Sequence, residues 1–510
     1  MEKPSLDSYN KLIEIWKEFY ALGNISNTLR WDMRSALPQG GIKQRAEEMG
    51  ILFGIMHRLC TSDEARCLLL ESEKSGNLEI LDTIQQRNLH IMRRQYDDSI
   101  NVPEELENKL RKQTTIATKA RASAIEKNDW TLLESELKKL FELVQERANR
   151  TMEARAAKNQ YESLFADYQV GIKLDYLEAL FADITKSIVP LAKKYAVMSR
   201  GVRADIIERE VDIRIQKSII QKLARFVSFD TDSESAFGRF AEGKDAFTMG
   251  NYDDVRVFVK YDENRFLTAV MSFLHESGHA LYNRNLREEW RYHPVGQHAG
   301  SAVTESQAKL IENMIGRSSE FWTYFMPILN ESTNGLFADA STDEFTKAVN
   351  PVILQPLRVF ADELTYSIHI IIRFEIERSL FAGKIGIAEI PSIWNELYQK
   401  HLGVEVRNDA EGVLQDPHWA IGMFGHFPMY ALGNIISAQL MESMEIDVPD
   451  WRNRLESGDV SQVISWMKQR IHQVGWLYEL PELIVHATGR KLSAKPYIKY
   501  LKQKYLDLYG

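Results

Sequence analysis

The sequence predicts a mainly α-helical protein: one continuous helical body with two lobes, a cleft between them and a small sheet. Three observations support this prediction. Apolar residues recur at three-to-four spacing over most of the 510 residues, which is the period of an amphipathic helix. Strand-like segments are few, and no proline-rich or glycine- and serine-rich linker divides the chain. Two separate helical domains are the alternative arrangement.

Helical periodicity covers both halves of the chain. It predicts helices over residues 9–29, 42–60, 80–96, 103–127, 132–157, 174–199, 266–286, 303–315, 345–382 and 390–402, and a mostly helical end over 460–509. Residues 421–440 come closest to a membrane-spanning run, but His426, Pro428 and Asn434 interrupt it. We therefore expect a buried helical stretch there and no membrane span.

Strand signals are concentrated near the middle of the chain. Residues 255–261, Val-Arg-Val-Phe-Val-Lys-Tyr, alternate in character and are rich in β-branched side chains, which is typical of a strand. A second, weaker candidate is 226–229. We expect two or three short strands beside the helix that follows at 266–286.

Composition argues against several classes of partner. The net charge of −9 argues against nucleic acid, because phosphate binding needs clustered lysine and arginine. The first seven residues contain no apolar core of a signal peptide. The two cysteines, Cys60 and Cys67, are expected to be buried core thiols in a reducing compartment. We therefore predict a cytoplasmic protein with neither a nucleic-acid nor a membrane partner.

The clearest chemical motif is His-Glu-x-x-His within an apolar helix. His275 and His279 are four residues apart, so on a helix they share one face and can bind one metal ion. Glu276 follows the first histidine, and its carboxylate can take a proton from the water that attacks a carbonyl group. The pattern is typical of zinc peptidases, although alone it also fits two hydrogen-bonded histidines near a core.

A site of this type needs a third protein ligand. Glu305 and Glu312 lie seven residues apart on one face of the helix predicted over 303–315. Glu305 is favoured by its position near the helix start, which the preceding loop can bring back to the metal. His293 and His298, in that loop, are the alternatives.

A substrate with a free carboxylate would need a fixed cation. Arg358, on the predicted helix 345–382, or Arg256, in the strand-like segment, can bind a carboxylate in bidentate fashion. Each can instead form a structural ion pair. His418 and Tyr430 are of the residue types that donate hydrogen bonds to an oxyanion in metallopeptidase sites, and core packing is their alternative role.

Several motifs in the same order resemble the Taq-type carboxypeptidases, metallopeptidases that remove single C-terminal residues. The resemblance runs along nearly the whole chain. The matching segments are Trp31-Asp32, Leu37 to Gly41 and Arg45 to Glu47, the His-Glu-x-x-His motif, Glu305 to Gln307 with 312–318, Arg358 to Asp362 as Arg-x-x-Ala-Asp, and Gly412 to Trp419 as Gly-x-x-Gln-Asp-x-His-Trp.

This resemblance implies one metallocarboxypeptidase catalytic domain over 1–510, mainly helical, with a deep central groove and a small sheet near the metal. A helical N-terminal lobe would span about 1–200, and a metal-site and substrate lobe about 201–510. One divalent metal ion per chain is expected, zinc first and cobalt or manganese as alternatives. A peptide substrate with a free C-terminus and a homodimer are expected as well.

The resemblance also implies a set of site residues. The metal ligands are His275, His279 and Glu305. The catalytic residues are Glu276 as general base, His418 and Tyr430. The substrate-binding residues are Arg358, which would bind the terminal carboxylate, together with Arg256 and Gln415.

The chain departs from the family pattern at four positions that we expect beside the substrate cleft. The family's His-Pro-Phe begins here with Asp245, and its Asp-x-Arg-x-Thr ends with Phe258. The histidine before Glu-Ser is Thr304, and a tyrosine in the Phe-Gly-x-Phe-Pro segment is His426. The metal residues are unchanged, so these departures concern substrate preference and rate.

We therefore predict a metallocarboxypeptidase that releases single C-terminal amino acids from peptides. An oligopeptidase or endopeptidase on the same scaffold is one alternative, and Arg358 argues against it because an endopeptidase has no terminal carboxylate to hold. A catalytically weak, metal-bearing peptide-binding protein is the other. The altered cleft favours that reading, whereas the intact Glu276 argues against it.

Overall fold

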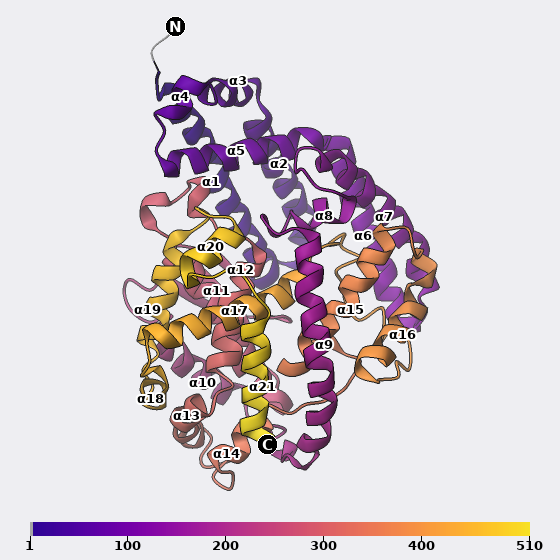
Figure 1. Cartoon of the computed structure of the whole chain (residues 1–510), viewed down its shortest axis with the longest axis vertical. Helices are drawn as coiled ribbons and strands as arrows, with labels where there is room; N and C mark the ends of the chain where they lie inside the picture. Colours follow the sequence, from indigo (N-terminus) through magenta and orange to yellow (C-terminus); the bar gives the residue numbers. More distant parts are fainter. Residues whose placement is uncertain (1–3) are drawn as a thin grey trace.

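Long helices dominate the computed structural model, which describes residues 4–510 (Figure 1). The first five gather at the end of the molecule where the chain begins. They are α1 (Asp7–Ser35), α2 (Ile42–Thr61), α3 (Asp63–Ser72), α4 (Ser75–Glu79) and α5 (Thr83–Asn101). The predicted mainly helical fold with a small sheet is confirmed.

The remaining helices build the body below this group. The long α9 runs beside the C-terminal α21 in Figure 1, and the two are in contact. The bounds are α6 (Glu104–Lys127), α7 (Thr131–Met152), α8 (Gln160–Phe165), α9 (Leu174–Met198), α10 (Ile213–Phe226), α11 (Phe266–Asn285), α12 (Ser301–Lys309), α13 (Ser319–Ser332), α14 (Thr342–Ala348), α15 (Glu363–Phe381), α16 (Ile390–Leu402), α17 (Pro428–Asp447), α18 (Trp451–Glu456), α19 (Ser461–Arg470), α20 (Leu480–Thr488) and α21 (Lys495–Tyr509).

Three strands form one sheet in the order β1-β3-β2. They are β1 (Gly238–Glu242), β2 (Phe247–Asn251) and β3 (Asp254–Val259), with β1 parallel and β2 antiparallel to β3. The strand predicted at 255–261 is therefore confirmed as β3. The one predicted at 226–229 is wrong: Phe226 ends α10, and the next three N–H groups bond back to carbonyl oxygens of that helix.

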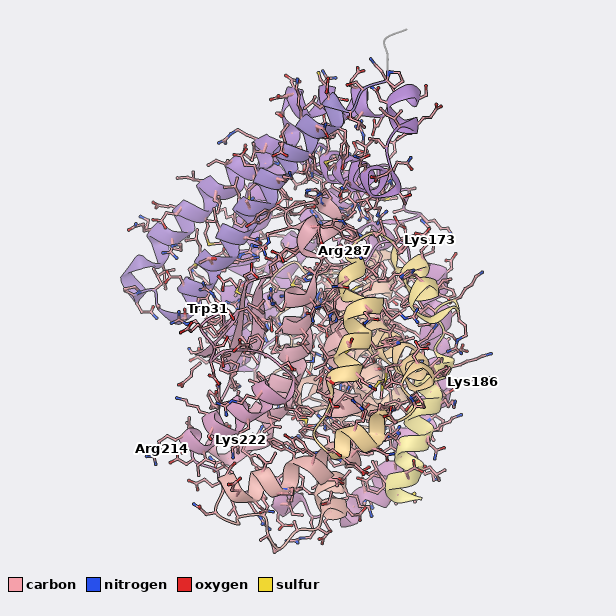
Figure 2. All side chains as sticks on the ribbon, turned by 90° about the vertical axis from the view of Figure 1, so that its left-hand side faces the viewer. Trp31, Lys173, Lys186, Arg214, Lys222 and Arg287 are labelled. Atoms are coloured by element: carbon pink, nitrogen blue, oxygen red, sulfur yellow. The ribbon has the colours of Figure 1, made fainter. Side chains whose placement is uncertain are left out.

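The sheet lies between the N-terminal helices and α11. Side chains alternate between the two faces of a strand. On the inner face, Thr248 of β2 bonds to Glu276 of α11. On the outer face, the Phe258 ring lies 3.9 Å from the Trp31 ring of α1, centroid to centroid. Figure 2 shows Trp31 where the N-terminal helices reach the rest of the body.

Close helix packing places α12 between α11 and α17. A Cβ atom at Gly278 of α11 would lie 2.5 Å from the Ala308 Cα on α12. A Cβ at Gly433 of α17 would lie 2.6 Å from the Glu305 Cβ. Both distances are shorter than real Cβ contacts. The two glycines therefore allow α11 and α17 to pack closely against α12, the helix that carries Glu305.

The helix predicted over 345–382 is interrupted. The chain leaves α14 at Ala348, runs without regular structure past Pro351 and Pro356, and makes the short turn η8 (Arg358–Phe360) before α15 begins. A proline disfavours helix at the residue before it. The Asp362 carboxylate then caps α15 by accepting two of its first N–H groups. The sequence had suggested that Arg358 lies on a long helix. It lies instead in the short turn before α15.

Two smaller expectations are corrected as well. Cys60 is buried, but Cys67 is exposed because it points outward from α3. The helical stretch predicted from residue 421 starts only at Pro428, where proline suits the first helical turn. Within residues 4–510, no helix is both long and apolar enough to cross a membrane. Residues 1–3, which belong to the N-terminal segment without a predicted signal peptide, lie outside the residues that the structure describes.

Candidate active site

Two histidines of α11 and one glutamate of α12 converge on one point. Ligand atoms of His275, His279 and Glu305 all lie within 4.8 Å of one another, and no other histidine, cysteine, aspartate or glutamate group in residues 4–510 meets this condition. The Glu305 Oε2 atom lies 3.9 Å from His275 Nε2 and is buried without a hydrogen-bond partner. A buried, unpaired carboxylate oxygen is costly, so the cluster fits a cation with two nitrogen ligands and one oxygen ligand.

The rival ligands lie elsewhere. Glu312, on the π-helical continuation η7 (Leu310–Ile315) of α12, accepts at 2.9 Å from Nδ1, the other ring nitrogen of His275. A carboxylate in this position orients a metal-binding imidazole. His298 bonds to Asn283 at 2.6 Å, and neither it nor His293 joins the cluster. Of the candidate third ligands, the structure brings Glu305 to the two histidines.

Glu276 is buried beside this cluster and held by the sheet. The Thr248 hydroxyl lies 2.7 Å from Glu276 Oε2 and 3.0 Å from its backbone oxygen. Burial raises the pKa of the Glu276 carboxyl. Sequence reasoning missed Thr248, because residues 247–251 carry glycine and asparagine, which are depleted in strands.

Arg358 lies in a buried network of charges. Its Nε donates to Asp416 Oδ1 at 2.8 Å, and its NH2 nitrogen is 2.7 Å from the same oxygen. Arg373 occupies the other oxygen of Asp416, with its Nε at 2.6 Å. Burial acts to raise the pKa of Asp416, but the two guanidinium groups outweigh it and hold that pKa well below its usual range. The structural ion pair named as an alternative for Arg358 is therefore present, and it fixes the orientation of the side chain.

Tyr430 lies next to Arg358 and bonds to His418. His418 Nε2 is 3.1 Å from the Tyr430 hydroxyl, and the Arg358 guanidinium lies over the Tyr430 ring at 5.5 Å. Tyr430 is one turn before Gly433, the residue that contacts Glu305. Burial lowers the pKa of His418 to about 3, so its ring is neutral near pH 7 and the pair carries no fixed charge.

Gln415 and Arg256, the other two predicted substrate-binding residues, already have partners within the protein. Gln415 Oε1 accepts from the Arg358 backbone N–H at 2.7 Å, and its amide nitrogen donates to three backbone oxygens. It therefore holds the η8 turn. Arg256 lies on the outer sheet face, paired with Asp254 at 2.7 Å. Since Thr248 and Glu276 are on the inner face, Arg256 is not brought together with the histidine cluster.

The four departures from the family pattern fall into two groups. His426 packs at 4.8 Å from the Tyr168 ring and 5.0 Å from the Tyr430 ring, centroid to centroid, and Thr304 directly precedes Glu305. Asp245, in contrast, is exposed in the turn between β1 and β2. Phe258 is buried on the outer sheet face. Only the first two therefore adjoin the candidate site.

Known relatives match along nearly the whole chain. A sequence model of the carboxypeptidase Taq (M32) metallopeptidase family matches residues 11–505. Carboxypeptidase 1 of Bacillus subtilis is 32% identical over 487 residues, 94% of each chain. Thermostable carboxypeptidase 1 of Thermus thermophilus is 31% identical over 512 aligned positions, 99% of each chain. The crystal structure of an M32 carboxypeptidase from Deinococcus radiodurans, 29% identical, has a TM-score of 0.93 over 99% of each chain.

Proposed function

The chain belongs to the carboxypeptidase Taq (M32) metallopeptidase family, and from this premise we propose which residues carry out its reaction. The predicted family is thereby confirmed. The protein is a metallocarboxypeptidase, a hydrolase of peptide bonds that depends on a divalent metal ion and acts on peptides. Neither the endopeptidase nor the weak peptide-binding alternative is favoured by these matches.

We propose that His275, His279 and Glu305 hold the metal ion, and that the ion is zinc. The convergence of their three ligand atoms, one of them a buried oxygen without a partner, carries the proposal. Two imidazoles and a carboxylate suit zinc and leave a position open, with cobalt and manganese as alternatives. When bound, such an ion polarises a carbonyl group and lowers the pKa of water.

The remaining roles follow from position. Glu276, whose carboxylate is held by Thr248, accepts the proton of the attacking water. Tyr430, backed by His418, donates to the oxygen of the scissile carbonyl. Arg358 binds the terminal carboxylate of the substrate through N–H groups that Asp416 and Tyr366 leave free. Gln415 acts on the substrate through Arg358, which it positions.

Peptide hydrolysis by matched variants tests these assignments. Metal-loaded protein is incubated with short N-blocked peptides, and products are read by mass. We expect stepwise loss of single C-terminal residues from the wild type and loss of turnover in Glu276→Gln with its metal retained. Internal cuts, or equal turnover by wild type and Glu276→Gln, would contradict the proposal.

Metal content tests the third ligand separately. Glu305→Ala is expected to lose stoichiometric metal, as is His275→Ala. Glu312→Gln, which removes the carboxylate that orients His275 and pairs with Lys309, is expected to keep metal with an affinity lowered about ten- to a hundredfold. Full metal content in Glu305→Ala would instead make Glu312 or His298 the candidate ligand.

We also propose one catalytic domain with lobes over about 1–200 and 201–510, a homodimer and a cytoplasmic location. The family match over residues 11–505 supports a single domain. The resemblance supports the dimer, and the use of only two cysteines supports the compartment. Light scattering coupled to size exclusion tests the dimer, since a single species near 59 kDa, the mass of one chain, would contradict it.

A further inference from the structure

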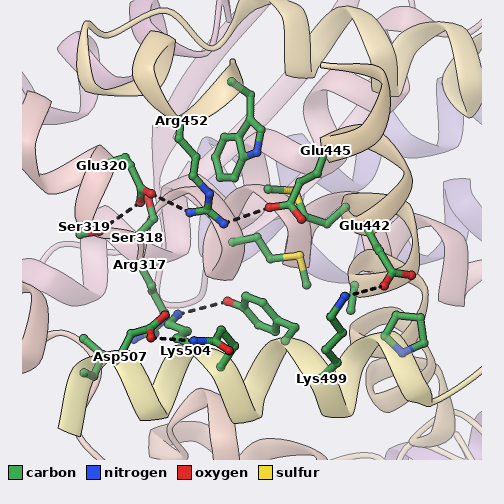
Figure 3. Close-up of a pocket in the computed structure, with 18 of the residues that line it drawn as sticks. Arg317, Ser318, Ser319, Glu320, Glu442, Glu445, Arg452, Lys499, Lys504 and Asp507 are labelled. Carbon is green, nitrogen blue, oxygen red and sulfur yellow. Dashed lines mark hydrogen bonds and ion pairs between the residues drawn. The ribbon is translucent and has the colours of Figure 1, made fainter. Parts of the chain in front are cut away.

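A second cavity lies among α13, α17, α18 and α21, lined by none of the residues assigned to the active site (Figure 3). Its volume is about 250 Å³. Its apolar lining includes Met314, Ala438, Met441, Trp451 and Leu508. A space of this size and character accepts one small apolar group, such as a single amino-acid side chain.

Charged side chains of both signs surround this apolar centre (Figure 3). Four are basic and four are acidic, so the lining carries no net charge: Arg317, Arg452, Lys499 and Lys504, and Glu320, Glu442, Glu445 and Asp507. Several already pair with one another; Arg452, for example, lies between Glu320 at 2.6 Å and Glu445 at 2.9 Å. A balanced rim favours neither a polyanion nor a simple cation, and it suits a zwitterion.

Arg317 and Glu445, on different walls of the cavity, can supply a donor and an acceptor for such a ligand. The NH2 nitrogen of Arg317 has its nearest carboxylate oxygen at 3.7 Å, on Glu312, which is beyond hydrogen-bond distance. Only one oxygen of Glu445 accepts from Arg452, and its other oxygen has no partner within residues 4–510. In Figure 3, Arg317 and Glu445 extend from opposite sides of the cavity.

We propose that this cavity binds a free α-amino acid with a long apolar side chain. The carboxylate would bind to Arg317, the ammonium group to Glu445, and the side chain would contact Met441 and Trp451. This is the class of molecule that a carboxypeptidase releases, so the enzyme's own product is the ligand. The choice of ligand rests on the carboxypeptidase activity, whereas the site itself rests on the cavity.

The cavity is also connected to the metal centre. Arg317 is 3.7 Å from Glu312 Oε1, and Glu312 Oε2 accepts from His275 Nδ1 at 2.9 Å and from Lys309 Nζ at 2.7 Å. A carboxylate bound to Arg317 draws that guanidinium away from Glu312. The Glu312 carboxylate then interacts more strongly with His275, and metal binding becomes tighter. By linkage, the metal tightens amino-acid binding by the same factor.

Calorimetry on the metal-loaded full chain, with L-norleucine as the probe, tests the site. We expect saturable binding, and binding about tenfold weaker for pentylamine and for hexanoate, since each lacks one charged hydrogen-bonding group. Ala438→Phe fills the cavity and should abolish binding. Glu445→Gln should weaken it about tenfold, whereas Asp447→Asn, a neighbour on α17 outside the cavity, should leave it unchanged.

Two results would overturn the proposal. If Arg358→Met abolishes norleucine binding while Ala438→Phe and Glu445→Gln leave it intact, the amino acid occupies the active site. If hexanoate binds as tightly as norleucine, the ligand is not an amino acid. Glu276→Gln should bind norleucine normally, so failure of the proposed catalytic roles and failure of this site are separate outcomes.

Competition with a chromogenic chelator tests the connection to the metal. Norleucine should raise metal affinity in the wild type about fivefold, the lower end of typical couplings between sites, and should have no effect in Ala438→Phe. An unchanged metal affinity in the wild type under saturating norleucine would show that a ligand at Arg317 does not affect the metal centre through Glu312.

Discussion

The surroundings of Arg358 and Arg256 differ although each guanidinium is paired with an aspartate. Arg358 and Asp416 have side chains that are 11% and 6% exposed, and Arg373 secures the second oxygen of Asp416. Arg256 and Asp254 are 23% and 56% exposed, two residues apart on one strand. The first pair is part of a buried network that extends to Tyr430, and the second is a local pair on the outer face of the central strand β3.

The two arginines differ in how rigidly their guanidinium groups are held. A buried charge needs partners that satisfy it, and those partners fix its direction. Arg358 therefore offers its free N–H groups to a ligand in one orientation, at little entropic cost. An exposed pair gains little from its own attraction and is screened by salt. Pairing with an aspartate alone does not separate Arg358 from Arg256, whereas burial and the shared network do.

The largest expected effect follows from replacing Arg358. Arg358→Met should lower kcat/KM by about a hundred- to a thousandfold, because removal of one partner of a buried charge pair costs about 2–5 kcal/mol. The selective readout is the ratio of rates for a peptide acid and the same peptide with a C-terminal amide. This ratio should be large in the wild type and near one in Arg358→Met.

Arg373→Met is the matched control, since it also breaks a pair with Asp416. It should destabilise the fold to a similar extent and keep the preference for the peptide acid. If both variants lose that preference equally, Arg358 acts only as a structural partner of Asp416.

The buried carboxyl group of Glu377 predicts a pH dependence of the free energy of unfolding. Glu377 accepts from Trp419, Tyr161 and the Gly425 N–H, and burial raises its pKa to about 7 from 4.5. A raised pKa adds stability that is complete below about pH 4.5 and is lost as the pH rises through 7. The loss amounts to about 3 kcal/mol.

Urea denaturation from pH 5 to pH 8 measures this loss. Glu377→Gln cannot ionise, so its stability relative to the wild type should improve by about 2.5 kcal/mol over this range, because part of the loss falls below pH 5. Glu396→Gln, an exposed change on α16, should follow the wild type throughout. Parallel profiles for wild type and Glu377→Gln would mean that the buried carboxyl keeps one protonation state.

Thr248 predicts a smaller effect, on the inner face of the sheet. Thr248→Val removes the hydroxyl that holds Glu276, and a hydrogen bond to a charged group contributes about 1.5–3 kcal/mol. We expect kcat to fall at least about tenfold, with KM and metal content unchanged. Thr248→Ser should restore most of the rate. If serine fails to do so, or if KM changes instead of kcat, the hydroxyl does not position the base.

How far the sequence predicted these features depends on their distance along the chain. His275, Glu276 and His279 are readable because one helix fixes their spacing, and Glu305 because a second helix starts at a predictable place. Thr248 lies 28 residues from Glu276 in the sequence, and only the strand pairing brings them together. The residues that line the second cavity are spread from Met314 to Leu508 over several helices, so no local pattern encodes it.

Arg256 is expected to give the smallest effect. Its pair with Asp254 is half open to solvent, and such pairs contribute about 1 kcal/mol or less. Its remaining contact is the Trp31 ring at 5.6 Å. Arg256→Ala should therefore change kcat/KM by less than about threefold and keep the preference for peptide acids over amides, with any stability loss reduced by salt. A loss of activity as large as that of Arg358→Met would mean that the peptide reaches the outer face of the sheet, and that burial does not separate the two arginines in function.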